Sequence, residues 1–387
     1  MSEGWVGSSV TFGKAIGVTL FSLVFLAIGI LILVVTEPAT ARQASAIDEI
    51  DRVAIADVSA GQVLAENEGQ VVHVVGRIDT DQMVTNDELG ISENAVLISW
   101  DSSIYQEFEE TTGTGDDERT VTVTRWIDQV AETPRNEGSR KTLPADGMSF
   151  ADNVAFGAFT LPEDLLLQLD REPLPITALP PSRAAGTLSN GILWTGNPDD
   201  PRIGDERLEF FIVRPPIDVT VIAQQNSSTL TDYQTESGAE IALLYEGTFS
   251  KDEIVAIERV VNQFVAWMVR FGSFVFFVFA FEVFALQFKP KFVFFRLIGK
   301  GTVFGAVLLL VVAIMALLIG LLRASIQPSA IWFVLAAVAG GTSIMWLVRK
   351  NREAAAERTA EREAEIAAWQ PQDEVRVGSQ PQDAVRQ

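Results

Sequence analysis

Two ionisable residues, Arg270 and Glu282, lie within one long apolar run of the chain, where a charged side chain is costly and is usually functional. Twelve positions separate them, about 18 Å along a helix at roughly 1.5 Å per residue, so they cannot pair within that helix. Arg270 lies near one end of the run and is expected to extend toward the interface, whereas Glu282 lies seven residues before Lys289. Arg270 and Glu282 are therefore candidates for an intramembrane interaction, either as interfacial anchors or as part of a small-solute or ion path.

Nucleophilic and metal chemistry have few residues to use in this chain. It contains one histidine, His73, and no cysteine, which excludes a histidine triad, a histidine-rich metal site, thiolate metal sites and disulfides. Valines flank His73 on both faces of an expected strand, which indicates a buried structural imidazole. No Gly-x-Ser-x-Gly, Ser-x-x-Lys or His-Glu-x-x-His spacing occurs, so we assign no catalytic residue and expect no enzyme. A membrane-bound enzyme that uses carboxylates stays open as an alternative.

Clusters of acidic residues are the remaining chemical candidates. Oxygen ligands suit calcium, but none of the clusters fits the twelve-residue calcium-loop pattern, and solvated surface is the interpretation we adopt. No metal ligand and no cofactor-binding residue is assigned. The clusters are Asp116-Asp117-Glu118, Asp199-Asp200 and Asp205-Glu206.

Four apolar runs must position Arg270 and Glu282. Residues 15–35 carry no charge and give about 31 Å of helix at roughly 1.5 Å per residue, which matches a hydrocarbon core of about 30 Å. Such runs must be helical because lipid offers the backbone no hydrogen-bond partner. An uncleaved anchor is favoured over a signal peptide cleaved after Ala41, because the first run is too long for a signal core. We predict transmembrane helices over residues 15–35, 267–288, 301–322 and 330–348.

Flanking basic residues predict the orientation of these helices. Lysines and arginines are concentrated in residues 289–300 and directly after residue 348, whereas the loop after residue 322 carries only Arg323. By the positive-inside rule both termini are cytoplasmic, and the large segment between the first two helices is outside the cytoplasm. The expected remaining segments are a short N-terminus (1–14), an acidic extracytoplasmic domain (36–266), an interfacial elbow (289–300) and a charged helix with a disordered tail (349–387).

The large segment is strongly acidic. Residues 37–266 hold 41 Asp and Glu against 15 Lys and Arg, whereas the whole chain has a net charge of −22. Such a surface repels nucleic acid and anionic lipid head groups, so neither is an expected partner of this domain. The expected partners are the lipid bilayer and other membrane proteins. Small residues such as Ala336, Gly340, Ala337 and Gly341 at helical spacing also permit a homo-oligomer.

Alternating β-branched and aromatic residues predict a mostly antiparallel α+β domain with flanking helices, attached to one N-terminal and three C-terminal transmembrane helices. Residues 107–119 and 174–181 are expected to be loops. A helix is expected over residues 46–60, although Val53, Ile55 and Val58 also suit a strand, and another begins at Ser250 with a capping box to Glu253. The expected strands are residues 70–78, 94–108, 119–130, 207–213, 217–224 and 240–245.

An ordered set of short motifs resembles the LUMA, or transmembrane protein 43, family. The set begins with Glu66-Asn67-Glu68-Gly69 and continues through Val71, His73 and Gly76. It resumes with Gly204-Asp205, Val219-Thr220-Val221-Ile222-Ala223, Thr235, Ser237-Gly238, Gly247 and Phe249-Ser250, and it ends with Trp267 and Arg270. The resemblance extends over about residues 60–350, and residues 110–150 and 170–195 diverge from it.

The resemblance implies a multi-pass membrane protein whose large domain is lumenal or extracytoplasmic. Eukaryotic members organise the endoplasmic reticulum and inner nuclear membranes and bind lamins and emerin, partners that we do not transfer. The acidic composition, with 7 Lys against 22 Arg, favours a prokaryotic member in a plasma or inner membrane; the endoplasmic reticulum or nuclear envelope is expected if the chain is eukaryotic. We therefore expect a non-enzymatic membrane organiser or scaffold. The carboxylate enzyme and the ion conduit remain alternatives.

Overall fold

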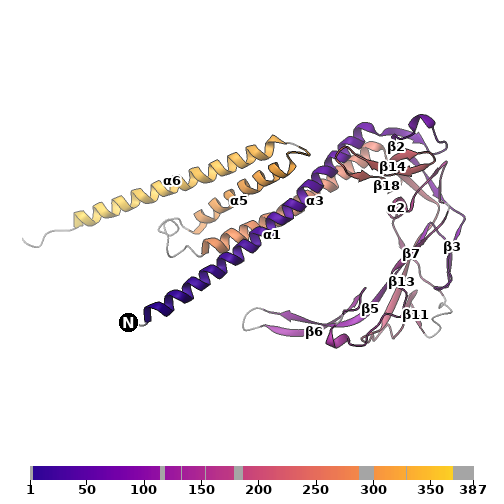
Figure 1. Cartoon of the computed structure of the whole chain (residues 1–387), viewed down its shortest axis with the longest axis horizontal. Helices are drawn as coiled ribbons and strands as arrows, with labels where there is room; N and C mark the ends of the chain where they lie inside the picture. Colours follow the sequence, from indigo (N-terminus) through magenta and orange to yellow (C-terminus); the bar gives the residue numbers. More distant parts are fainter. Residues whose placement is uncertain are drawn as a thin grey trace, which may run out of the picture. The chain divides into compact units, whose positions relative to one another are not determined.

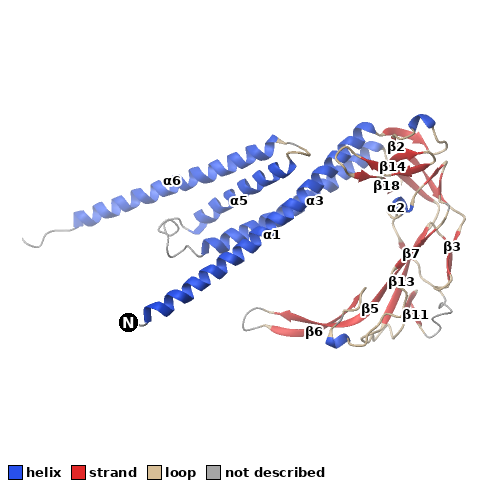
Figure 2. Ribbon diagram, in the orientation of Figure 1, coloured by secondary structure: helices blue, strands red, loops and turns tan. Residues whose placement is uncertain are grey.

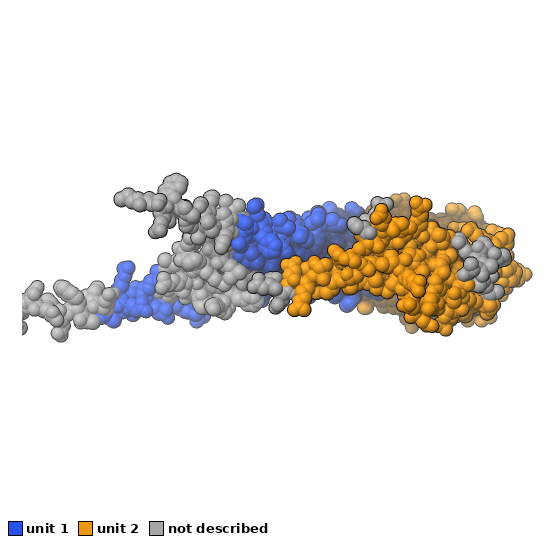
Figure 3. Space-filling model, turned by 90° about the horizontal axis from the view of Figure 1, so that it is seen from below, with its two compact units in different colours: residues 1–45, 261–387 blue, residues 46–260 orange. Residues whose placement is uncertain are grey.

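The structure is a computed structural model that describes residues 3–113, 118–131, 133–152, 154–177, 186–286, 300–327 and 329–368. It forms two compact units, residues 1–45 with 261–387 and residues 46–260 (Figure 3). The boundaries between them fall inside two long helices, α1 (Glu3–Val53) and α3 (Lys251–Leu286). We call the first the helical unit and the second the strand-rich unit, and we describe each separately (Figures 1 and 2).

The helical unit contains the greater parts of α1 and α3 together with α5 (Lys300–Arg323) and α6 (Ala330–Ala368). Its core joins Leu33 of α1, Phe277 of α3 and Met315 of α5. A Cβ added at Gly29 would lie 3.3 Å from the Phe276 Cβ, so α1 approaches α3 closely where it has no side chain. Likewise, a Cβ at Gly340 would lie 3.6 Å from the Ala313 Cβ. Gly340 therefore packs within the chain, whereas Gly341 faces open space.

Three helices among the described residues are long and apolar enough to cross a membrane: Gly17–Val53, Lys251–Phe281 and Ala330–Ala364. The stretch Leu308–Arg323 is apolar but shorter within the described part of the chain. Large apolar side chains cover the outside of these helices, with Leu31, Phe271 and Val338 each more than 60% exposed. Such a surface is unfavourable in water and suits hydrocarbon. The arrangement of one plus three spans, and the side on which each terminus lies, remain predictions.

The strand-rich unit contains two main sheets among its described residues. In the first, the strand order is β1-β2-β8-β9-β15-β14-β18, and β2 also pairs with β14, so the path closes on itself. Only β1 with β2 and β15 with β9 run parallel. The strands are β1 (Ile55–Ser59), β2 (Val71–Asp79), β8 (Ala155–Phe156), β9 (Phe159–Thr160), β14 (Ile217–Asn226), β15 (Thr229–Thr231) and β18 (Leu243–Glu246).

The second sheet has the order β11-β12-β13-β5-β6, with β10 beside β13 and β7 beside β5, and all of these pairs are antiparallel. Two small hairpins, β3 with β4 and β16 with β17, complete the unit. The strands of the second sheet are β5 (Leu97–Thr112), β6 (Arg119–Ile127), β7 (Gly147–Phe150), β10 (Glu172–Pro173), β11 (Thr187–Ser189), β12 (Ile192–Trp194) and β13 (Glu206–Val213). The remaining elements are β3 (Met83–Asn86), β4 (Ile91–Asn94), β16 (Tyr233–Gln234), β17 (Glu240–Ile241), a short helix α2 (Glu163–Leu166) and the 3-10 turns 65–67 and 134–136.

Side-chain alternation along β2 explains how its sheet is buried on both faces. Val72 and Val74 belong to the large core that continues into the second sheet. Val71, on the other face, packs with Ile50 from the end of α1 and Ile254 from the start of α3. The predicted burial of both faces of this strand is therefore confirmed.

The sequence predicted the helix start at Ser250 correctly, but it misplaced the end of the helix expected over residues 46–60. The capping box forms as predicted, since the Ser250 backbone N–H donates to the Glu253 carboxylate at 2.9 Å. The helix expected over residues 46–60 is wrong beyond Val53, where β1 follows. Its register shifts between Ile55 and Val58, with Asp57 at a φ of 57°. The loop expected over 107–119 is also shorter, because β5 continues to Thr112.

Candidate functional site

The most distinctive polar site is a buried ion pair in the helical unit. Glu37 of α1 accepts two hydrogen bonds from the Arg270 guanidinium of α3, from Nε at 2.6 Å and from Nη2 at 2.9 Å. Both side chains are almost fully buried, at 1% and 8% exposed. The planar fork of arginine matches a carboxylate in this two-bonded geometry, which fixes α1 against α3.

A third charge lies beside this pair. Arg323, the last residue of α5, has its Nε 3.6 Å from Glu37 Oε2, a separation too long for a hydrogen bond. That Nε is buried and makes no hydrogen bond within the described part of the chain. We call Glu37, Arg270 and Arg323 the charge cluster; it contains one carboxylate and two guanidinium groups.

Two tryptophans and a cavity adjoin the charge cluster. The Arg270 guanidinium carbon lies 5.4 Å from the ring centre of Trp267 and 4.8 Å from that of Trp332, distances typical of cation–π contacts. Beside it is a cavity of about 300 Å³ between α3, α5 and α6. Except for Arg270, its lining is apolar or aromatic. The lining residues are Trp267, Arg270, Phe271, Phe274, Val312, Met315, Ala316, Ile319, Trp332 and Leu335.

The cluster is suited to electrostatic binding. Arginine stays protonated in proteins, so the two guanidinium groups cannot relay protons. They can bind an anion in fixed geometry, because each carries five N–H donors and only two of those on Arg270 are bound to Glu37.

The two residues predicted from the sequence both lie on α3, twelve positions apart. Arg270 binds Glu37 of α1, and its position at the membrane interface stays a prediction. Glu282 lies within α3, but its side chain is outside those that the structure describes, and its role stays a prediction. Sequence reasoning missed Glu37 and Arg323. Each lies just beyond the end of a predicted span, and comparing the ends that face the same side would have grouped them.

His73 has a structural environment. Its Nδ1 accepts the Asp57 backbone N–H at 3.2 Å, and its Nε2 lies 3.0 Å from the Phe249 carbonyl oxygen. A neutral imidazole with the proton on Nε2 satisfies both contacts. The side chain thereby holds the irregular part of β1 against the segment before α3.

The acidic clusters are either exposed or engaged by the backbone. Glu206 is buried, and its carboxylate accepts the backbone N–H of Thr142 at 2.7 Å and of Leu143 at 2.8 Å. Asp205 accepts the Arg202 backbone N–H at 2.7 Å. Asp116 and Asp117 lie outside the described residues. Within the described residues, no group of three or more His, Cys, Asp or Glu side chains is placed to hold a metal ion.

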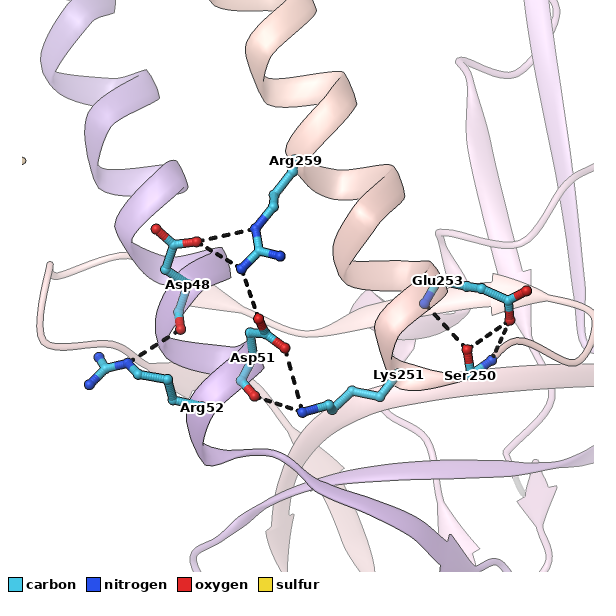
Figure 4. A network of polar contacts seen from close by, with 7 residues as sticks. All are labelled: Asp48, Asp51, Arg52, Ser250, Lys251, Glu253 and Arg259. Carbon is cyan, nitrogen blue, oxygen red and sulfur yellow. Dashed lines mark hydrogen bonds and ion pairs between the residues drawn. The ribbon is translucent and has the colours of Figure 1, made fainter.

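A second set of ion pairs lies in the strand-rich unit, where the end of α1 meets the start of α3 (Figure 4). Arg259 Nη2 lies 3.0 Å from Asp48 Oδ1 and 2.8 Å from Asp51 Oδ2. The ammonium of Lys251 lies 3.5 Å from Asp51 Oδ1 and donates to the Asp51 carbonyl oxygen at 2.6 Å. We call these four residues the surface network, because Asp48 and Arg259 are 53% and 43% exposed.

The sequence profile of one family, described as Transmembrane protein 43, matches residues 99–334. The chain belongs to the transmembrane protein 43 family. The matched segment includes Arg270, Arg323 and both tryptophans of the site, whereas Glu37 and the Glu66–Gly69 motif precede it. The resemblance seen in the sequence is thus confirmed, and the protein is a membrane protein of this family.

Animal members of the transmembrane protein 43 family match the chain at low identity. The rat protein is 27% identical over 233 residues, which cover 54% of this chain and 58% of the rat protein. The mouse protein is 25% identical over 288 residues, covering 68% and 71%, respectively. A Drosophila melanogaster homolog is 26% identical over 223 residues, covering 53% and 59%. These relatives are animal proteins, so the expected prokaryotic origin is not confirmed. No solved structure matches the chain.

Proposed function

We propose that this member of the transmembrane protein 43 family is a non-enzymatic membrane organiser. Its helices anchor an acidic, extracytoplasmic strand-rich unit, and that unit presents a docking surface to the water-facing parts of other membrane proteins.

The observation that carries this proposal is a two-stranded ribbon in the second sheet. Strand β13 pairs with β5 only between Leu97 and Ile104, whereas β6 pairs with β5 from Ile104 to Thr112. Beyond Tyr105, whose backbone still bonds to residues 204 and 205, β5 and β6 continue without a third strand, as an extension that Figure 1 shows. We call residues 105–112 and 119–126 the ribbon. A two-stranded ribbon is marginally stable by itself, so its side-chain contacts must hold it in shape.

Those contacts are present on both faces of the ribbon. On one face, Arg125 lies 4.3 Å over the ring of Phe108 and bonds to Glu110 at 3.0 Å. On the other face, the Tyr105 and Thr124 hydroxyl groups lie 2.5 Å apart. The ribbon is thus an ordered surface.

One edge of the ribbon is open to a partner. Asn136 covers the backbone of β5 at Glu107 through both of its amide atoms, but β6 pairs only with β5 among the described strands. Strand β6 is largely exposed and contains no acidic residue, although the unit as a whole is strongly acidic. An unpaired edge rich in Val and Thr suits the addition of a partner strand.

Two buried polar groups of the strand-rich unit have structural surroundings. His73 and Glu206 are engaged by backbone groups, which suits them to holding the fold.

The test of the proposed docking surface is site-specific photo-crosslinking of the full chain in native membranes, with the crosslinker at Thr122 on β6 and, as control, at the exposed Asp232. We expect discrete protein adducts from position 122 and none from position 232.

A pair of matched variants sharpens the experiment. Val121 on the ribbon and Val63 outside it are 37% and 36% exposed. Val121→Lys should remove the adducts at position 122, because an edge lysine opposes strand pairing, whereas Val63→Lys should leave them unchanged. Equal labelling at positions 122 and 232, or adducts that survive Val121→Lys, would contradict the proposed docking surface.

A further inference from the structure

The charge cluster contains an uncompensated positive charge. One carboxylate, Glu37, faces two guanidinium groups, and all three side chains are at most 12% exposed. Arg270 takes both carboxylate oxygens through hydrogen bonds, which leaves Arg323 with only a 3.6 Å contact. A buried charge without a partner is strongly unfavourable, so this site calls for an additional anionic group.

The depth of the cluster identifies the kind of anion available. Glu37 follows the first predicted span by two residues, Arg270 is the fourth residue of the second, and Arg323 directly follows the third. Trp267 and Trp332 lie at the corresponding ends of the second and fourth spans. These ends all face the same side of the membrane in the predicted topology, and tryptophan is enriched where the head groups begin. Lipid phosphates lie at this level.

The adjoining cavity suits the other part of such a molecule. It lies next to Arg270 and is lined by side chains such as Phe274, Met315 and Leu335. Its volume of about 300 Å³ is at the lower end of small-molecule sites. Leu335 is 42% exposed, so the wall of the cavity reaches the lipid-facing surface of the helices. A free phosphate or an acidic peptide segment would leave this apolar space without a matching occupant.

We propose that the charge cluster and its cavity form a binding site for an anionic glycerophospholipid. The lipid phosphate accepts hydrogen bonds from Arg323 and from the remaining donors of Arg270, and one acyl chain occupies the cavity beneath the two tryptophans. The phosphodiester supplies the negative charge that the cluster lacks. This inference is independent of the docking role proposed for the strand-rich unit.

The test uses the full chain in phosphatidylcholine nanodiscs, titrated with phosphatidylglycerol of the same acyl chains. Native mass spectrometry of the released protein measures retained lipid. A parallel titration with phosphatidylglycerol brominated on its acyl chains measures quenching of tryptophan fluorescence. We expect retention of phosphatidylglycerol in preference to phosphatidylcholine and to diacylglycerol, together with saturable quenching.

Arg323→Gln is the decisive variant. It leaves the Glu37–Arg270 pair intact and removes only the excess positive charge, so the helices should still fold. We expect about tenfold weaker phosphatidylglycerol binding, the scale of a lost hydrogen bond to a charged group. Arg349→Gln is the matched control, because Arg349 is 77% exposed and its ion pair in the described part of the chain is with Glu353 of the same helix, α6. It should leave lipid binding unchanged.

A second pair of variants examines the cavity without altering any charge. Leu335→Trp fills part of the cavity and should reduce lipid retention in native mass spectrometry, whereas Val334→Trp, which does not line the cavity, should not. Equal retention of phosphatidylglycerol and diacylglycerol would overturn the proposed phosphate contact. Equal effects of Arg323→Gln and Arg349→Gln would also overturn the site. If Leu335→Trp changed the oligomeric mass but not lipid retention, the cavity would instead be an interface with a second copy.

Discussion

The charge cluster of the helical unit and the surface network of the strand-rich unit both bring acidic and basic side chains together, but they differ in charge balance and burial. The surface network has two carboxylates, one guanidinium and one ammonium, and its side chains are between 18% and 53% exposed. The charge cluster has one carboxylate for two guanidinium groups, and none exceeds 12% exposure. Water compensates the first set, and only protein or lipid groups can compensate the second.

Because of this difference in burial, the two sets of ion pairs should contribute differently to the free energy of unfolding. An exposed pair typically contributes about 0–1 kcal/mol, because water screens it and ordering two long side chains costs entropy. Removing one member of a buried pair costs roughly 3–5 kcal/mol, because the other charge is left unpaired. A third ion pair, Arg77 with Asp218, is more exposed than either set, since its side chains are 59% and 56% exposed.

The comparison of the two units depends first on which side of the membrane each segment faces. Labelling of introduced cysteines from one side of the membrane gives an all-or-none answer. The chain has no cysteine, so Ser227→Cys in the strand-rich unit and Ala360→Cys on α6 each introduce a unique thiol. Both positions are exposed. We expect an impermeant maleimide applied to intact cells, or to sealed vesicles of known orientation, to label one variant and not the other. Labelling of both without permeabilisation would overturn the predicted orientation.

Glu37→Gln should give the largest loss of stability. It leaves Arg270 and Arg323 buried without a carboxylate, and we expect a cost of roughly 3–5 kcal/mol, seen as a lower midpoint of thermal unfolding in detergent. The double variant Glu37→Gln with Arg270→Gln should recover part of that loss, because it removes one of the unpaired charges.

Glu353→Gln is the control for this measurement. Glu353 pairs with Arg349 and Lys350 on α6, and it is 41% exposed. The expected change is below about 0.5 kcal/mol. If Glu37→Gln were as mild as Glu353→Gln, the buried pair would not be a main connection between α1 and α3.

Sequence periodicity predicted the longer strands of the strand-rich unit but missed most of the short ones, and the reasons are local. Strand β13 alternates in burial along most of its length, whereas the centres of β2 and β14 are buried on both faces. The boundary after Val53 could not be predicted, because Val53, Ile55 and Val58 fit both a helix and a strand. The break depends on the irregular Asp57 and on a hydrogen bond to His73, sixteen residues away.

The candidate site was only half predictable for a different reason. An isolated arginine within an apolar run draws attention to Arg270, but its partner Glu37 is 233 residues distant and belongs to no shared motif. Arg323 contributed only to the prediction of orientation. The cavity depends on how α3, α5 and α6 pack, and no pattern within one helix encodes the volume left between three.

The surface network should respond to salt where the charge cluster does not. Asp51→Asn removes contacts to Arg259 and Lys251, and we expect a loss below about 1 kcal/mol at low salt. Raising the salt to about 1 M, where the screening length is about 3 Å, should reduce the difference from wild type. The loss from Glu37→Gln should persist under the same conditions. Equal salt sensitivity would mean that the two sets are equally hydrated.

Removing the exposed Arg77–Asp218 ion pair should cause the smallest change in stability. The pH dependence of that change shows whether the ion pair stabilises the fold. The hydrogen bond from Arg77 lowers the pKa of Asp218 below its ordinary value in the folded chain. An aspartate with a depressed pKa stabilises the fold above its unfolded pKa, near 3.9, and this contribution disappears as the pH falls through the folded value. Asp218→Asn should therefore be slightly less stable than wild type at pH 7, and the two should converge near pH 2. Thermal unfolding of both proteins between pH 7 and pH 2 measures this difference. A gap that widened in acid would show that the carboxylate acts through some contact other than its ion pair with Arg77.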